Sequence, residues 1–221
     1  MNVGLGTGFD AVIFDLDGTL IDTERHYVDS AHAALHGLGH AVRRDFLLTL
    51  VGRSDAEGNR MLGDHIGPDF DETAFNTAWS AEIARAIGVR IPAMPGADTL
   101  LSHLSASARP FALATNSATE AAHRKLKRAG LTRWFRHDHV FGHDRVTMPK
   151  PAPDLYLAAA AAVGADPARC LAFEDSHAGI EAALSAGMTV VQVPGLLPNR
   201  HPDAHIQADG LIDGARAVGL I

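Results

Sequence analysis

Cysteine is almost absent from the sequence: the chain has a single one, Cys170, so no disulfide can form within it. Cys170 lies in the apolar run 170–173, which is typical of a buried strand thiol rather than a reactive one. Long apolar runs are also missing, since none approaches the roughly 18 residues that a membrane helix needs. The N-terminus lacks the charged start and apolar block of a secretory signal. We therefore expect a soluble, cytoplasmic protein.

Positive charge is scarce as well, because 19 Lys and Arg residues stand against 26 Asp and Glu, a net charge of −7. A nucleic acid or an anionic membrane as main partner would require a basic stripe, which the sequence does not contain. A small anionic substrate would need local cations instead. With 221 residues and 47% hydrophobic content, the chain can bury the core of one domain with an insertion, or of two modest domains. We expect a monomer, with a dimer as the alternative.

Short apolar runs alternate with helical patterns along most of the chain, which is typical of repeated strand and helix units around a mostly parallel sheet. The predicted strands are 11–14, 110–114, 139–141, 170–173 and 189–193. The predicted helices between the later strands are 97–106, 118–129, 153–163 and 177–186. Each of these helices has Ala or Leu at helical spacing. The predicted fold class is therefore α/β.

The interval between residues 14 and 110 breaks this alternation, because it is too long for a simple crossover. It contains four predicted helices and no convincing strand: 24–37, 43–51, 54–66 and 71–87. An all-helical insert after the first strand explains this pattern. Residues 21–23 then form the outgoing linker, and the prolines at 92 and 95 mark the returning one.

Two aspartates follow the first strand directly, in Asp15-Leu-Asp-Gly-Thr. In a parallel sheet, ligands bind outside the carboxyl ends of the strands, so Asp15 and Asp17 lie where a site is expected. Gly18 permits a tight loop, on which one carboxylate can attack a phosphorus atom while the other handles the proton of the leaving group. The alternative is that Asp-Gly-Thr only forms a turn that caps the next segment.

Polar residues also follow two later strands. Thr115-Asn116-Ser117 comes after 110–114, and its hydroxyls and backbone amides can bind phosphoryl oxygens. Helix N-capping by Ser117 is the structural alternative. Lys150 stands between two prolines, a rigid frame that gives its ammonium a fixed direction. A surface lysine in a proline-rich turn is the alternative here.

A second acidic pair, Glu174 and Asp175, follows the strand 170–173. Carboxylate oxygens of this kind suit Mg²⁺, while an N-cap at Asp175 or Ser176 is the structural alternative. Together, the strand ends bring two acidic pairs, a hydroxyl and a cation to one edge of one sheet. Helix caps alone would seldom produce this combination, so the pattern favours phosphoryl-transfer chemistry.

These motifs resemble those of the haloacid dehalogenase superfamily of phosphohydrolases. Its four motifs match Asp15-Leu-Asp-Gly-Thr, Thr115-Asn-Ser, Lys150-Pro and Glu174-Asp-Ser-His-Ala-Gly-Ile, in the right order across nearly the whole chain. The insert after the first motif is similar to that of the branch holding β-phosphoglucomutase and sugar-phosphate phosphatases. The resemblance implies a Rossmann-like core domain over 1–22 and 91–221, with an all-helical cap domain over 23–90.

The resemblance also implies roles in catalysis. Asp15 would be the nucleophile that forms an aspartyl-phosphate, Asp17 the general acid and base, and Lys150 a catalytic cation. Thr115 and Asn116 would bind the phosphoryl group of the substrate. The implied function is a Mg²⁺-dependent phosphatase acting on a small phosphorylated metabolite such as a sugar phosphate.

The metal site follows from the same resemblance. Mg²⁺ would be held by Asp15, by the backbone carbonyl of Asp17 and by Asp175, with Glu174 binding it directly or through water. The positive charge of Mg²⁺ and Lys150 would offset the repulsion between a carboxylate and a phosphate dianion.

The sequence departs from the family in three places. Pro149 stands where a glycine usually precedes the motif lysine, Tyr27 where β-phosphoglucomutase has a cap histidine, and Asp55 where the mutase has a cap arginine. Arg53 lies two residues before Asp55, and we expect it to bind the substrate from the cap. The changes in the cap favour a phosphatase over the alternative, a phosphosugar mutase. A non-catalytic ligand-binding protein is a further alternative, against which the presence of both Asp15 and Asp17 argues.

Overall fold

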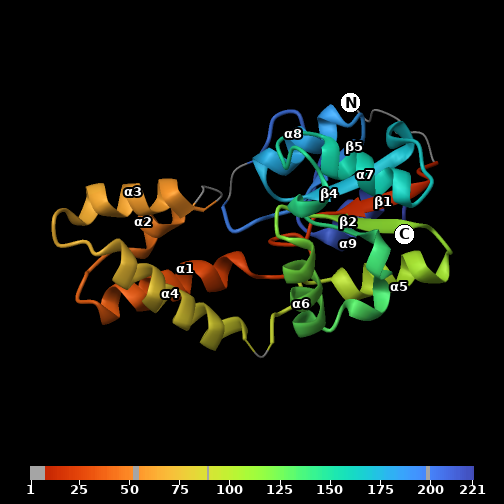
Figure 1. The fold of residues 1–221 in the computed structure, drawn as a ribbon. Coiled ribbons are helices and arrows are strands. Elements are labelled where there is room, and N and C mark those ends of the chain that lie inside the picture. The colour runs from red at the N-terminus through yellow and green to blue at the C-terminus, as the bar shows by residue number, and fades with distance from the viewer. Residues whose placement is uncertain (1–7, 52–54, 89, 198–199) are drawn as a thin grey trace. The chain divides into compact units, whose positions relative to one another are not determined.

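The structure, a computed structural model, describes residues 8–51, 55–88, 90–197 and 200–221. The chain divides into two compact units, which are drawn in Figure 1. Met1–Asp22 with Pro92–Ile221 form the first, called here the sheet unit, and Thr23–Ile91 form the second, called the helical unit. None of the helices that the structure describes is both long and apolar enough to span a bilayer.

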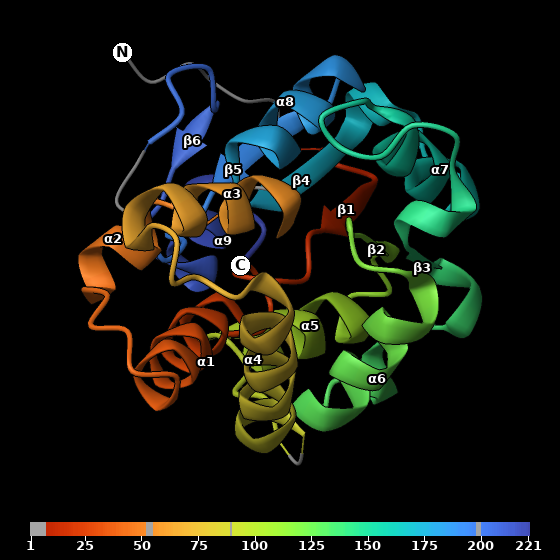
Figure 2. The ribbon, with the colours of Figure 1, turned by 60° about the vertical axis from the view of Figure 1, so that its left-hand side comes forward.

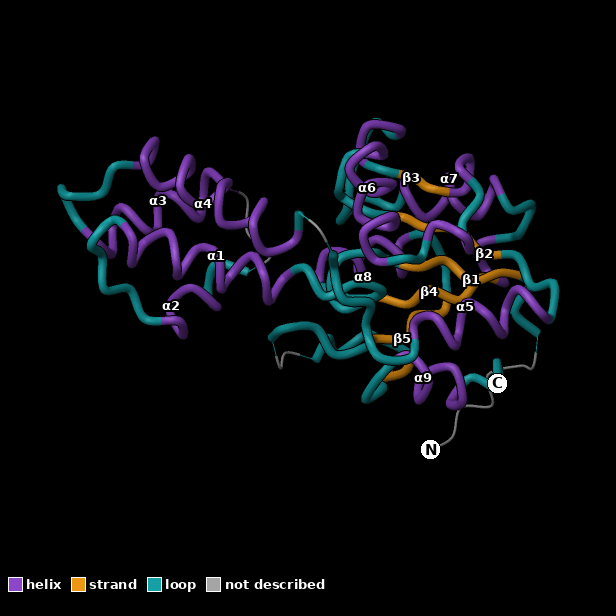
Figure 3. The backbone as a smooth tube through the Cα atoms, turned by 90° about the horizontal axis from the view of Figure 1, so that it is seen from below, coloured by secondary structure: helices purple, strands orange, loops and turns teal. Residues whose placement is uncertain are grey.

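The sheet unit is built on six strands in the order β3-β2-β1-β4-β5-β6. Their bounds are Ala11–Phe14 (β1), Phe111–Ala114 (β2), Val140–Phe141 (β3), Cys170–Glu174 (β4), Thr189–Gln192 (β5) and Ile206–Gln207 (β6). In Figure 3, strands β3, β2, β1, β4 and β5 follow one another across the sheet in this order. Every pairing between these described strands is parallel. The five predicted strands and the α/β fold class are confirmed.

Helices cover both faces of the sheet. They are α5 (Ala97–Ala106), α6 (Thr119–Ala129), α7 (Asp154–Ala162), α8 (His177–Ser185) and α9 (Leu211–Ala217), with short 3₁₀ helices at Thr132–Trp134, His137–His139, His143–Arg145 and Pro167–Arg169. Figure 1 shows α7 and α8 on one side of the strands and α5 and α9 on the other. The sequence predicted α5 to α8 and did not predict α9 or β6.

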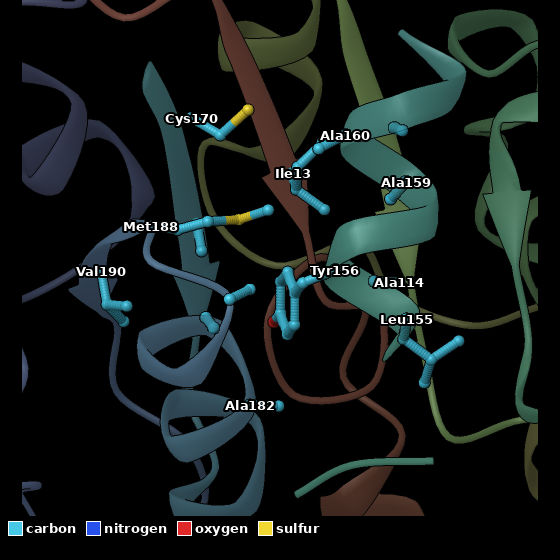
Figure 4. Close-up of a cluster of buried hydrophobic side chains, with 14 of the residues drawn as sticks. Ile13, Ala114, Leu155, Tyr156, Ala159, Ala160, Cys170, Ala182, Met188 and Val190 are labelled. Atoms are coloured by element: carbon cyan, nitrogen blue, oxygen red, sulfur yellow. The ribbon is translucent and has the colours of Figure 1, made fainter. Parts of the chain in front are cut away.

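The core between the sheet and α7 and α8 follows from the alternation of side chains along each strand. Ile13, Ala114 and Cys170 belong to one buried cluster with Tyr156 of α7, part of which Figure 4 draws. Cys170 is a free, buried thiol, as predicted, and burial raises its pKa to about 11. Small residues in α7 and α8, among them Ala159 and Ala182, are fully buried in this cluster, so both helices lie close to the strands.

The helical unit contains α1 (Glu24–Gly37), α2 (Arg44–Leu48), α3 (Asp55–Ile66) and α4 (Glu72–Ile87), and no strand among its described residues. Helices α1 and α4 pack side by side (Figure 2). Trp79 Nε1 on α4 donates to the carbonyl of Tyr27 on α1 at 3.1 Å. The four helices predicted in this interval are confirmed, although α2 ends at Leu48, before the predicted end.

The segments that leave and re-enter the sheet unit run beside each other. The amide of Asp22 donates to the carbonyl of Pro92, and the amide of Met94 donates to the carbonyl of Leu20, each at 2.9 Å. Ile21 and Ala93 form an antiparallel bridge between them. The insertion therefore begins and ends at neighbouring points of the backbone, directly after the strand that precedes Asp15.

Candidate active site

The register of the sheet brings the predicted motifs to one edge. Phe14 at the end of β1 is opposite Phe173 in β4, and also opposite Leu113 in β2. The amide of Asp15 continues this pattern by donating to the carbonyl of Phe173 at 3.0 Å. The residues that follow these three strands therefore meet at their carboxyl ends.

Lys150 is buried at the centre of this edge, with 3% of its side chain exposed. Its Nζ donates to Asp15 Oδ1 and to Glu174 Oε1, at 2.6 Å each. The side chain of Asn116 holds the backbone of Lys150, accepting from its amide at 3.0 Å and donating to its carbonyl at 3.1 Å. Pro149, in place of the glycine usual in the family, does not prevent Lys150 from reaching Asp15. Because the Asn116 side chain is engaged in this way, its backbone amide is the group left for the predicted phosphate contact.

Glu174 is fully buried and accepts five hydrogen bonds. Oε1 accepts from Lys150 and from the hydroxyl of Tyr156, the latter at 3.1 Å. Oε2 accepts from the amides of Asp175 and Ser176 and from the Ser176 hydroxyl. Both oxygens of Glu174 thus fix its neighbours, which favours a link to a metal through water over direct ligation. Tyr156 was not predicted; its signal is one polar aromatic residue in an alanine-rich helix.

Asp175 is oriented by the first motif. Thr19 Oγ1 donates to Asp175 Oδ1 at 3.0 Å, and both residues are buried. Gly18 has a φ of +90°, and a Cβ at this position would lie 2.2 Å from Asp175 Oδ2. Glycine is therefore needed here for the turn and for the approach of Asp175. Ser176 caps α8 by accepting from the amide of Gly179, so the predicted capping role holds beside the acidic pair.

The buried acidic cluster fits a hard divalent cation. Asp15, Glu174 and Asp175 each place one oxygen within 4.8 Å of the others. Among the described residues, the three carboxylates lie beside the ammonium of Lys150, which contacts Asp15 and Glu174. Oxygen donors and this charge suit a cation such as Mg²⁺.

Burial and neighbouring charges both shift the pKa values of this cluster. Burial raises the pKa of Asp15 to about 7, although Lys150 lowers it. Burial alone would lower the pKa of Lys150, but the carboxylates of Asp15 and Glu174 raise it above its usual value. A cation bound beside Asp15 would favour the ionised, nucleophilic form of that carboxylate.

Asp17 lies in a second polar cluster. Lys125 Nζ, from α6, is 2.7 Å from both carboxylate oxygens of Asp17 and 2.8 Å from Ser117 Oγ. Ser117 Oγ donates to Asp17 Oδ2 at 2.9 Å. The N-cap of α6 is Ala118, so the expectation that Ser117 caps this helix is wrong; its hydroxyl is used by Asp17 instead. Lys125 was not predicted, because nothing in the sequence separates it from the other cations of α6.

Thr115 is buried at the end of β2, where its hydroxyl accepts from the amide of Ser117 at 3.0 Å. Arg53, the predicted substrate contact in the helical unit, lies outside the described residues. The structure thus brings Asp15, Lys150, Glu174 and Asp175 into one cluster, with Asp17 held in the neighbouring one.

Comparison of the whole chain with known proteins agrees with this geometry. The sequence model of the haloacid dehalogenase-like hydrolases matches residues 9–187. Over 188 residues, the chain is 36% identical to a Drosophila melanogaster protein assigned as a pseudouridine-5'-phosphatase, covering 82% of this chain and 80% of that one. It is 30% identical to the fructose-1-phosphate phosphatase YqaB of Escherichia coli (strain K12), covering 84% and 96%. The chain spans 54% of the bifunctional riboflavin kinase/FMN phosphatase of Arabidopsis thaliana, to which it is 33% identical, with 95% of this chain covered.

Solved structures share the fold. A Thermotoga maritima protein assigned to the β-phosphoglucomutases superposes with a TM-score of 0.78 at 27% identity, covering 96% of this chain and 97% of the other. A hydrolase from Deinococcus radiodurans R1, determined with bound phosphate and sodium, gives a TM-score of 0.74 at 31% identity. That comparison covers 96% of this chain and 89% of the other.

Proposed function

The chain belongs to the haloacid dehalogenase-like hydrolase family and is a phosphoric monoester hydrolase, and from this premise we propose its mechanism and substrate class. It transfers the phosphoryl group of a small sugar phosphate to Asp15 and then to water, with Mg²⁺ as cofactor. The observation that carries this proposal is the contact of Lys150 with Asp15 Oδ1, because it places a fixed cation beside a buried carboxylate at the sheet edge.

The first half of the reaction forms the aspartyl-phosphate. An oxygen of Asp15 attacks phosphorus, and the bond between phosphorus and the ester oxygen breaks. Asp17 gives its proton to the departing oxygen, a contribution of about 10²- to 10⁴-fold. Lys150 and the Thr115 hydroxyl donate to phosphoryl oxygens, and the backbone amide of Asn116 can add to them.

The second half releases phosphate. Asp17, now a carboxylate, takes a proton from a water molecule as that water attacks phosphorus. The bond between phosphorus and the Asp15 oxygen breaks, so phosphate leaves and the Asp15 carboxylate is restored. Asp17 therefore acts once as an acid, in its protonated form, and once as a base, in its ionised form, in each catalytic cycle.

Mg²⁺ would be held by Asp15, Asp175 and the backbone carbonyl of Asp17, where it would supply positive charge against the approach of two anions. Glu174 supports this site by holding Lys150 and the amide of Asp175. We keep a direct Glu174 ligand as the less favoured form of this proposal, since its oxygens already accept five hydrogen bonds.

The substrate class rests on the relatives. A fructose-1-phosphate phosphatase and a pseudouridine-5'-phosphatase both act on phosphate esters of a sugar, which supports a sugar phosphate for this chain. Arg53 stays a predicted contact to the part of the substrate that does not react. The cytoplasm, where such metabolites are found, is the location that fits this role, and we keep a monomer as its expected state.

A phosphosugar mutase is the second candidate, since the Thermotoga maritima structure shares nearly the whole fold. The two activities differ in the acceptor of the phosphoryl group, which is water in a phosphatase and a sugar phosphate in a mutase. Glucose 1,6-bisphosphate as primer should therefore leave net phosphate release in place. Isomerisation of the sugar phosphate without release of phosphate would instead identify the protein as a phosphosugar mutase.

Asp15→Asn is the decisive test of the nucleophile. Wild type is screened with Mg²⁺ against a panel of phosphorylated metabolites, and released phosphate is measured. On the best ester, Asp15→Asn should fall to background, because an amide cannot form the acyl phosphate. Thermal unfolding checks that the variant is folded. Turnover retained by the folded variant would mean that another residue is the nucleophile.

A further inference from the structure

Lys125 contacts the proposed acid and base, Asp17, from a separate helix. Its Nζ lies 2.7 Å from each oxygen of Asp17 and 2.8 Å from Ser117 Oγ, so three acceptors surround its ammonium. The Ser117 hydroxyl closes the triangle by donating to Asp17 Oδ2. None of the four sequence motifs includes Lys125.

The position of Lys125 is fixed by the packing of α6. Ala122 and Leu126 on the same helix are buried, so the helix cannot shift without disturbing the core. The exposed fractions of the Lys125 and Asp17 side chains are 13% and 23%. The partners of an ordinary surface pair such as Arg136 and Asp138 are exposed by 72% and 62%, and pairs of that kind contribute little.

We propose that Lys125 is a positioning residue for the acid and base step, and that it acts by fixing the carboxylate plane of Asp17. This inference rests on the proposed function. Proton transfer requires the donor and acceptor atoms to lie about 2.6–3.2 Å apart. Asp17 stands on a loop, and its carboxylate could rotate about two side-chain bonds. Its two contacts to the Lys125 ammonium and its contact to Ser117 leave the carboxylate one orientation. The same orientation then serves the proton donated in the first half-reaction and the proton taken in the second.

Three variants test the proposal. Lys125→Met removes the ammonium and keeps the length of the side chain, Lys125→Arg keeps the charge, and Lys127→Met is the matched control, since Lys127 is exposed on the same helix. Each is compared with wild type on the best ester of the panel, with Mg²⁺. We expect Lys125→Met to lower kcat on the order of 10- to 100-fold with KM changed less than about threefold. Lys125→Arg should recover most of this loss, and Lys127→Met should match wild type.

A double variant separates positioning from a general structural role. If Lys125 acts through Asp17, then Lys125→Met should cost less than about twofold further in an Asp17→Asn background, because the two effects are not additive. An equal loss in both backgrounds would overturn the proposal, as would wild-type kcat in Lys125→Met or a change confined to KM.

Folding and the proposed function are checked separately. Should Lys125→Met not fold, Lys125→Cys is assayed before and after alkylation with 2-bromoethylamine, which restores an amine; wild type, whose Cys170 is buried, receives the same treatment. Recovery of kcat on alkylation supports the proposal, and no recovery overturns it. If wild type releases phosphate from no ester, the proposed function fails and this inference fails with it. An active wild type with an equally active Lys125→Met overturns the inference alone.

Discussion

Asp15 and Asp17 are two residues apart, yet their surroundings give them different roles. Asp15 is buried beside Lys150 and two further carboxylates, and burial raises its pKa to about 7, so a bound cation would favour its ionised form. Asp17 is partly exposed and oriented by Lys125 and Ser117. This difference in burial and contacts fits the proposed division between nucleophile and proton carrier, which residue type alone does not explain.

Asn116 provides a test of how Lys150 is positioned. Asn116→Ala removes both hydrogen bonds that the side chain makes to the Lys150 backbone, so kcat should fall on the order of tenfold as the ammonium loses its fixed direction. Asn59→Ala is the matched control in the helical unit, where Asn59 donates to Glu72 and Asn76. Each variant should lose about 1 kcal/mol per hydrogen bond in stability. Assays at a temperature well below the midpoint of unfolding should separate the loss of activity from the loss of stability. Equal kcat values for Asn116→Ala and Asn59→Ala would show that Asn116 does not act through Lys150.

At the residue scale, the sequence pointed to the residues of the proposed catalytic core more readily than to the residues that support them. Asp15 and Asp175 come after strands, and Lys150 stands between two prolines. Such positions can be recognised in the amino-acid sequence. Lys125 and Tyr156 reach the site from within helices α6 and α7, where their spacing resembles that of solvated or core residues. Their roles depend on which helix face meets the sheet edge, and this is decided by tertiary packing.

At the scale of elements, the predicted strands and helices are confirmed wherever the hydrophobic pattern is long. Helix α5 was predicted over 97–106 and is found at Ala97–Ala106. The missed strand and the missed α-helix are short: β6 has two residues, and α9 has seven, one of them Gly214, which weakens a helix pattern. The end of α2 was also misplaced, because residues after Leu48 form turns within an apolar run.

Two glycines in helices should respond in opposite ways to alanine. A Cβ at Gly179 in α8 would lie 1.6 Å from Glu174 Oε1, so Gly179→Ala must displace the buried carboxylate that holds Lys150. Gly58 in α3 has nothing within 4 Å of the same position, so Gly58→Ala should raise stability by up to about 1 kcal/mol through helix propensity.

Chemical denaturation and kcat measure both variants. Gly179→Ala should lose on the order of 1–3 kcal/mol, the usual cost of overpacking, together with much of its activity. Gly58→Ala is the control for the substitution itself and should keep wild-type kcat. A stable and fully active Gly179→Ala protein would contradict the close approach of α8 to Glu174.

At the scale of the whole molecule, one sheet edge gathers the buried carboxylates of Asp15, Glu174 and Asp175 beside the ammonium of Lys150. The insertion leaves and returns at Leu20 and Met94, so the long helical segment does not disturb the meeting of the strand ends. Three carboxylates face one ammonium there. The global stability of the protein should therefore depend on what neutralises this edge, either a proton or a divalent cation.

The pH dependence of unfolding without metal tests this view. Burial raises the pKa of Asp15 from 3.8 to about 7, so between these values the folded chain binds more protons than the unfolded chain. The free energy of unfolding then decreases as pH rises through this window, and this contribution of Asp15 is lost above about pH 7. With a chelator present, the melting temperature of wild type should fall more between pH 5 and pH 8 than that of Asp15→Asn, which lacks the titrating group.

Groups far from Asp15 titrate equally in both proteins, so the difference between the two curves reports Asp15 together with the groups that interact with it, such as Lys150. Millimolar Mg²⁺ at pH 8 should raise the melting temperature of wild type and should raise that of Asp15→Asn less, because the variant has lost a charged ligand. The same chelator should abolish phosphate release, and added Mg²⁺ should restore it. Parallel curves of melting temperature against pH for the two proteins would show that the surroundings of Asp15 do not disfavour its ionised form. Full turnover in the presence of chelator would show that the mechanism does not use a divalent cation.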